Sequence, residues 1–90
     1  MKEKPLMVLK LAKRIKDLRK KAGYTSYESF AYEHNITRSQ WGRYERGEDI
    51  RFSSLIKVCN VFKISLEDFF SEGFQDHQPE NTYQNKIAEL

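Results

Sequence analysis

Residues 35–47, NITRSQWGRYERG, decide the fold, because they combine a turn with a short helix whose start is well specified. Asn35 tolerates the left-handed conformation that a tight turn needs. Thr37 and Gln40 match a capping box, in which the threonine hydroxyl accepts a hydrogen bond from the Gln40 amide and the glutamine side chain reaches back. The stretch therefore predicts a turn followed by a helix over about residues 38–46.

Gly42 lies in the middle of this predicted helix, where glycine costs about 1 kcal/mol relative to alanine. Because successive helical residues turn by roughly 100° about the axis, Trp41 and Tyr44 fall on one face and predict core anchors. The opposite face spans about 140° and holds Arg38, Ser39, Gly42, Arg43 and Arg46. We therefore expect Gly42 to face outward, with the space beside it left open.

Further helices are predicted on both sides of this stretch. Apolar residues at helical spacing predict a first helix over about residues 6–22, with Gly23 at its end. The sequence TSYE at 25–28 matches a second capping box, with the Thr25 hydroxyl accepting from the Glu28 amide. Two more helical segments follow, at residues 53–62 and 65–70.

Length and composition favour one small cytoplasmic domain. Ninety residues are only just enough for a single hydrophobic core, and we expect an all-α, compact five-helix domain over residues 1–74 with a polar tail over residues 75–90. The one cysteine, Cys59, predicts a buried free thiol in a reducing compartment. Basic residues interrupt the apolar N-terminal stretch too early for a signal peptide or a membrane span. The sequence predicts no metal site, no cofactor and no small-molecule ligand.

Three stretches of the chain resemble the Cro/repressor (XRE-type) helix-turn-helix domains. They are RIKDLRKKAG, FAYEHNITRSQWGRYERG and LIKVCNVFKISLEDFF, distributed between Arg14 and Phe70. The resemblance implies a fold of the phage-repressor type, in which the second and third of five helices bind double-stranded DNA. It implies that Arg19 and Glu45 form a buried, structural ion pair. It also implies base-facing positions for Arg38, Ser39, Gly42 and Arg43.

Other residues are candidates for contacts with the DNA backbone. The first interpretation of Gln40 is capping, and the alternative is an approach to the backbone. Tyr27 stands where the family usually has a glutamine that contacts a phosphate, and its side chain either makes that contact through the hydroxyl or packs in the core. The amides near Ser26 and Tyr27 are candidates for binding a phosphate, and Arg46 adds a charge at the edge of the outward face.

These features predict a non-enzymatic, sequence-specific DNA-binding protein, a small transcriptional regulator that inserts helix 38–46 into the major groove. The first 23 residues carry nine Lys or Arg against two acidic residues, which fits either a phosphate-facing end or a solvated surface. We expect a homodimer on a pseudo-palindromic site, joined through the last helix, Phe74 or the terminal YQNKIAEL. The alternative is a protein-interaction module, antitoxin-like or an assembly subunit, with weak or lost DNA binding.

Overall fold

The computed structural model describes residues 4–48 and 50–75, which form the five helices α1 (Leu6–Lys21), α2 (Tyr27–Glu33), α3 (Arg38–Glu45), α4 (Phe52–Phe62) and α5 (Leu66–Phe69). The all-α expectation is confirmed for these residues, and each predicted helical range is correct to within one residue at either end. The predicted tail lies outside the described residues beyond Gln75, so the boundary after residue 74 stays a prediction. Within residues 4–48 and 50–75, no helix has both the length and the apolar character that crossing a membrane requires.

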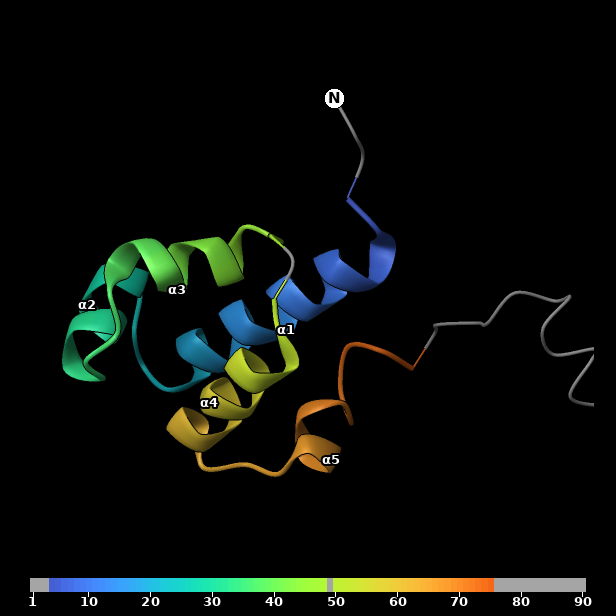
Figure 1. Cartoon of the computed structure of the whole chain (residues 1–90). Coiled ribbons are helices and arrows are strands. Elements are labelled where there is room, and N and C mark those ends of the chain that lie inside the picture. The colour runs from blue at the N-terminus through green and yellow to red at the C-terminus, as the bar shows by residue number, and fades with distance from the viewer. Residues whose placement is uncertain (1–3, 49, 76–90) are drawn as a thin grey trace, which may run out of the picture.

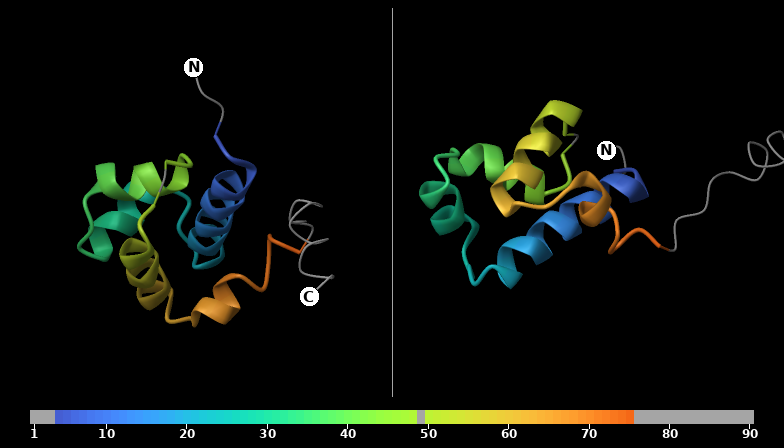
Figure 2. Two further views of the ribbon diagram at one scale, coloured as in Figure 1. Left: turned by 45° about the vertical axis from the view of Figure 1, so that its right-hand side comes forward. Right: turned by 90° about the horizontal axis from the view of Figure 1, so that it is seen from below.

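Helix α3 makes most of its helix contacts with α2 and α1. In Figures 1 and 2, α2 and α3 lie side by side at one end of the molecule. Helix α5 contacts α4 and lies away from α2 in the same views. The predicted helix-turn-helix pair, α2 and α3, thus packs against α1 through α3. Helix α5 lies away from this pair.

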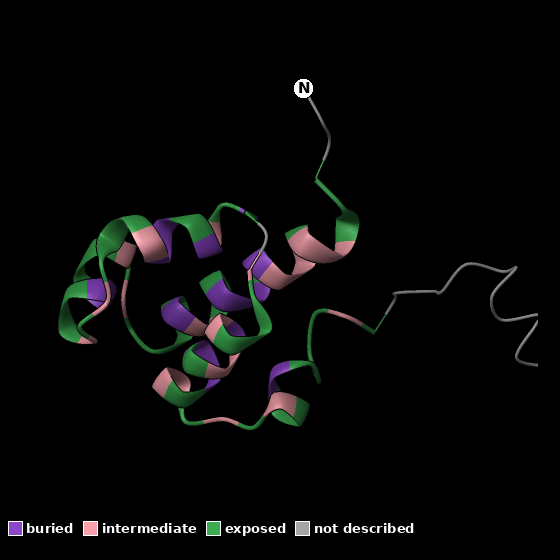
Figure 3. Cartoon of the chain, viewed as in Figure 1, coloured by how far each residue is buried: buried purple, intermediate pink, exposed green. Residues whose placement is uncertain are grey.

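The core forms where the apolar sides of the helices meet, as Figure 3 shows by the buried residues on the inner sides. The largest fully buried side chains are Trp41, Phe30, Phe69, Ile15 and Val58. Trp41 and Tyr44 are both buried, which confirms them as the anchors of α3. Cys59 is a buried free thiol, as predicted, and its burial raises the pKa of the thiol.

Helices α1 to α4 end in the same way, with one residue at positive φ after which a backbone amide returns to a carbonyl of the last turn. At the end of α2, Asn35 has φ of 58° and the Ile36 amide donates to the Ala31 carbonyl at 2.9 Å, which confirms the predicted turn. Lys63 takes the same place after α4 with φ of 57°, where a glycine would be unstrained. These sharp ends let the chain change direction directly after each short helix.

Helix α2 begins one position later than the capping box predicts. Ser26, not Thr25, is the N-cap, and its hydroxyl oxygen accepts from the Ser29 amide at 3.3 Å. Both residue types can cap a helix, so the sequence leaves the choice between neighbours to tertiary packing. The observed start places Phe30 and Ala31 in the core.

Candidate nucleic-acid interface

A buried ion pair fixes α3 against α1. Arg19 donates to Glu45 twice, from Nε to Oε2 at 3.0 Å and from Nη2 to Oε1 at 2.7 Å. The exposed fractions of the two side chains are only 4% and 6%. Trp41 donates to the same carboxylate at 2.6 Å, and the Tyr24 carbonyl accepts from Arg19 at 2.9 Å. Donation to Glu45 raises the pKa of Arg19, so the predicted ion pair is present and its geometry orients the whole of α3.

The outward face of α3 carries polar side chains. Four of its predicted members are exposed: Arg38, Ser39, Arg43 and Arg46. Helix α3 starts as predicted at Thr37, whose hydroxyl oxygen accepts from the Gln40 amide at 3.1 Å. Since Trp41 on the opposite side has no exposed surface, the direction in which the arginines leave the helix is set by the core.

Gly42 is buried, and the expectation of open space beside it is wrong. A Cβ atom placed on Gly42 would lie 3.2 Å from Cε1 of Tyr27, 3.3 Å from its hydroxyl oxygen and 2.7 Å from Nη1 of Arg46. The ring that α2 contributes and the end of the Arg46 side chain therefore cover the glycine. The position of Gly42 around the axis of α3 is outward, as predicted. Helical rotation alone does not show that a side chain of α2 covers this position. The glycine allows α2 and α3 to approach closely, and its base-facing role stays a prediction.

Substituting Gly42 by leucine is expected to lower the free energy of unfolding by about 1–3 kcal/mol, because a large side chain must displace Tyr27. Gly42→Ala should gain less than the roughly 1 kcal/mol that helix propensity predicts, since the tyrosine ring has to shift. In a Tyr27→Ala background the gain should be larger, because only the flexible end of Arg46 then remains beside the new methyl group. Urea unfolding followed by Trp41 fluorescence measures all four variants, and a full gain from Gly42→Ala beside an intact Tyr27 would refute the packing role.

The Gln40 side chain does not complete the capping box, so the first interpretation of this residue is wrong. Its Nε2 donates to the hydroxyl of Tyr44 at 2.7 Å, because a residue four positions on lies on the same side of the helix. Gln40, Arg43 and Arg51 then line a hollow of about 300 Å³ where α3 meets the start of α4. The approach of Gln40 to a DNA backbone stays a prediction.

At the start of α2, Tyr27 is half-buried and packs against the core cluster. Packing is thus observed for its ring, while a phosphate contact through its hydroxyl stays a prediction. The Ser26 hydroxyl donates to Oε1 of Glu28 at 2.9 Å. Hydrogen bonds from its own backbone amide and from Ser26, together with the charges of Arg38 and Arg19, lower the pKa of Glu28. A carboxylate therefore stands at the place where the amides near Ser26 were expected to meet a phosphate.

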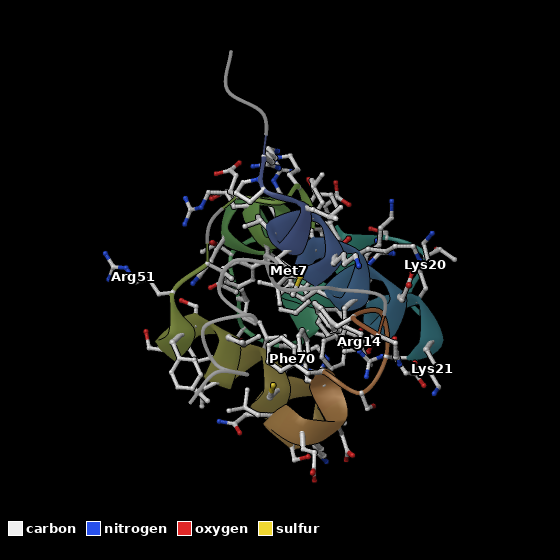
Figure 4. All side chains as sticks on the ribbon, turned by 90° about the vertical axis from the view of Figure 1, so that its right-hand side faces the viewer. Met7, Arg14, Lys20, Lys21, Arg51 and Phe70 are labelled. Atoms are coloured by element: carbon white, nitrogen blue, oxygen red, sulfur yellow. The ribbon has the colours of Figure 1, made fainter. Side chains whose placement is uncertain are left out.

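Two residues at the hollow, Glu48 and Arg51, were missed by the sequence reasoning. Figure 4 shows Arg51 extending from the body on the opposite edge from Lys20 and Lys21. Part of the dense basic charge of α1 therefore points away from the hollow. No pattern marks Arg51 in advance, because an arginine before a helix is not a capping signal; only the fold brings it beside Arg43.

The described residues contain no group of three His, Cys, Asp or Glu side chains placed to hold a metal ion. Comparison with family models matches residues 14–71 to the Cro/C1-type HTH DNA-binding domain. Searches of curated proteins and of solved structures each found no match. The matched segment takes in the ion pair, the outward face of α3 and the hollow, and it covers more than half of the chain. The chain therefore belongs to the Cro/C1-type (XRE) family of helix-turn-helix DNA-binding domains.

Proposed function

We propose that this protein is a sequence-specific regulator that inserts α3 into the major groove of double-stranded DNA. The observation that supports this most directly is the exposed set of Arg38, Ser39 and Arg43 on a helix locked from below by a buried ion pair. Membership of a DNA-binding family gives the class of ligand. Because arginine can donate two hydrogen bonds to O6 and N7 of guanine, Arg38 and Arg43 are the candidates for reading bases.

Contacts to the DNA backbone are proposed for the groups that border this face. Arg51 and Gln40 line the hollow beside Arg43, where a phosphate next to the groove would find donors. The Tyr27 hydroxyl is a further candidate at the start of α2. Contacts of this kind fix the position of the protein on the duplex, and the base contacts then supply the sequence preference.

Arg38→Ala and Arg43→Ala are each expected to weaken binding at the preferred site by about 1–3 kcal/mol and to relax its sequence preference. Fluorescence anisotropy titrations against genomic fragments, at several salt concentrations, measure both effects. Lys20→Ala is the matched control, because it removes the same charge from the edge opposite Arg51. Its loss should be small and the same for every sequence.

A loss from Arg43→Ala that equals the loss from Lys20→Ala at every sequence would remove Arg43 from base reading. Binding that ignores sequence, or no binding by the unmodified protein, would reject the regulator. That outcome would favour the second candidate function, a helix-turn-helix module that binds another protein.

We further propose that the protein acts as a homodimer on a pseudo-palindromic site, since one helix in a groove makes limited contact and half-sites are read by paired copies. Phe70, which directly follows α5, is the candidate at the centre of the dimer interface, because it is 42% exposed and its ring packs 4.9 Å from that of Phe74. Helix α5 lies away from α2. The other predicted surface, YQNKIAEL, lies outside the described residues.

Phe70→Ser is expected to raise the dissociation constant of the dimer by about tenfold or more, as loss of a central aromatic contact does. Sedimentation equilibrium measures this constant, and circular dichroism checks that the variant stays folded. Tyr32→Ser on α2 is the control, because Tyr32 is 85% exposed but lies on a different helix. An unchanged dimer in Phe70→Ser would place the interface elsewhere.

A further inference from the structure

Glu48 holds the guanidinium of Arg46 at the edge of the outward face. Oε2 of Glu48 accepts from Nη2 of Arg46 at 3.1 Å and from Nε at 3.3 Å. Both side chains are about half exposed, with fractions of 54% and 44%. The same guanidinium covers Gly42, so Arg46 lies folded back along α3 instead of extending into solvent.

The turn after α3 determines where Glu48 stands. Gly47 has φ of 79°, and the amide of Glu48 donates to the carbonyl of Arg43 at 3.2 Å. Gly47 is buried against α1, since a Cβ atom there would lie 3.1 Å from Cδ2 of Leu9. The backbone of this turn is therefore held in place. Its conformation sets the position of Glu48 beside the outward face of α3.

Glu48 also borders the hollow that Arg43 and Arg51 line. A carboxylate and a phosphate offer the same kind of acceptor pair to a guanidinium. In the free protein, Glu48 therefore accepts hydrogen bonds from Arg46 on the side of the molecule where DNA phosphates are proposed to lie.

We propose that Glu48 competes with DNA phosphate for Arg46 and thereby lowers the affinity of the protein for duplex DNA. The inference rests on the proposed function. Binding requires Arg46 either to leave Glu48 for a phosphate, which breaks the ion pair between the two side chains, or to stay paired and make no phosphate contact. Because binding to DNA of arbitrary sequence depends almost entirely on phosphate contacts, the effect is most directly seen there.

Glu48→Gln is expected to raise the affinity for a fluorescent duplex of mixed sequence, about two helical turns long, by about two- to fivefold at low salt. The dependence of log affinity on log salt should steepen by up to about 0.9, the value for one more neutralised phosphate. Anisotropy titrations between about 50 and 200 mM salt measure both quantities. Glu67→Gln on α5 is the matched control, because it makes the same change in net charge on another helix.

A double-mutant cycle separates direct competition from a general charge effect. With Arg46→Gln already present, Glu48→Gln should raise the affinity no more than Glu67→Gln does. If Glu48→Gln equals Glu67→Gln in the unmodified background, or keeps its full effect without Arg46, the competition is refuted while the proposed function stands. If the unmodified protein binds no duplex at any salt concentration, the proposed function itself fails.

Discussion

Replacing Arg19 with methionine is expected to lower the free energy of unfolding by about 3–5 kcal/mol, because it leaves the carboxylate of Glu45 buried without its charged partner. Glu45 would keep only the donor from Trp41, and the Tyr24 carbonyl would lose the donor it has. Methionine preserves much of the apolar stem of arginine. The decrease in the free energy of unfolding therefore reflects the loss of the charge more than the loss of packing volume. Urea unfolding followed by circular dichroism measures the change.

Lys20→Met is the control for this variant, since Lys20 is the next residue along α1 and is exposed; it should change stability by less than about 0.5 kcal/mol. Adding Glu45→Gln to Arg19→Met should recover part of the loss, because the amide removes the stranded charge. Equal losses from Arg19→Met and Lys20→Met would show that the pair contributes little to folding.

The parts of this fold that could be predicted are those encoded within one helix or one turn. Periodicity predicts the helices, and the turn at Asn35 is predictable because its left-handed conformation depends on its own side chain and backbone. Trp41 and Tyr44 were placed in the core because the rotation about α3 separates them from the arginines. The ion pair between Arg19 and Glu45 was predicted only through the family resemblance, because no local sequence pattern indicates a contact between residues so far apart in the chain.

The errors arise where a second element intervenes. The rotation of about 100° per residue predicts the correct side of α3 for Gly42. It cannot predict the cover over this side, because the Tyr27 ring belongs to α2. Thr25 and Ser26 have similar capping power, so packing of the following helix decided between them. For Gln40 a different hydrogen-bond partner lies one turn away, since its Nε2 donates to the hydroxyl of Tyr44, and the capping pattern takes no account of this partner. Arg51 lines the same hollow as Arg43 only because the fold brings the start of α4 beside α3.

Arg14→Met is expected to lower the free energy of unfolding by about 2–4 kcal/mol, because the buried guanidinium is the donor for the end of α5. Its Nε donates to the Phe69 carbonyl at 2.7 Å and its Nη2 to the Asp68 carbonyl at 2.9 Å. The guanidinium also lies 5.7 Å from the centre of the Phe69 ring and pairs with Glu72 at 3.2 Å. Methionine would leave the Phe69 carbonyl without this side-chain donor and would remove the hydrogen bonds that join α5 to α1, although the Asp68 carbonyl would still accept from Ser71. Urea unfolding again gives the magnitude.

Lys13→Met is the control for Arg14, because Lys13 is adjacent on α1 and 75% exposed, and it should change stability by less than about 0.5 kcal/mol. The two buried arginines should differ in their effect on DNA. Arg19 orients α3, so folded Arg19→Met should bind a duplex carrying one half-site more weakly than the unmodified protein. Arg14 orients α5, so folded Arg14→Met should bind the same duplex with unchanged affinity. Equal losses of half-site affinity in the two variants would mean that α5, as well as α1, helps to hold α3 in place.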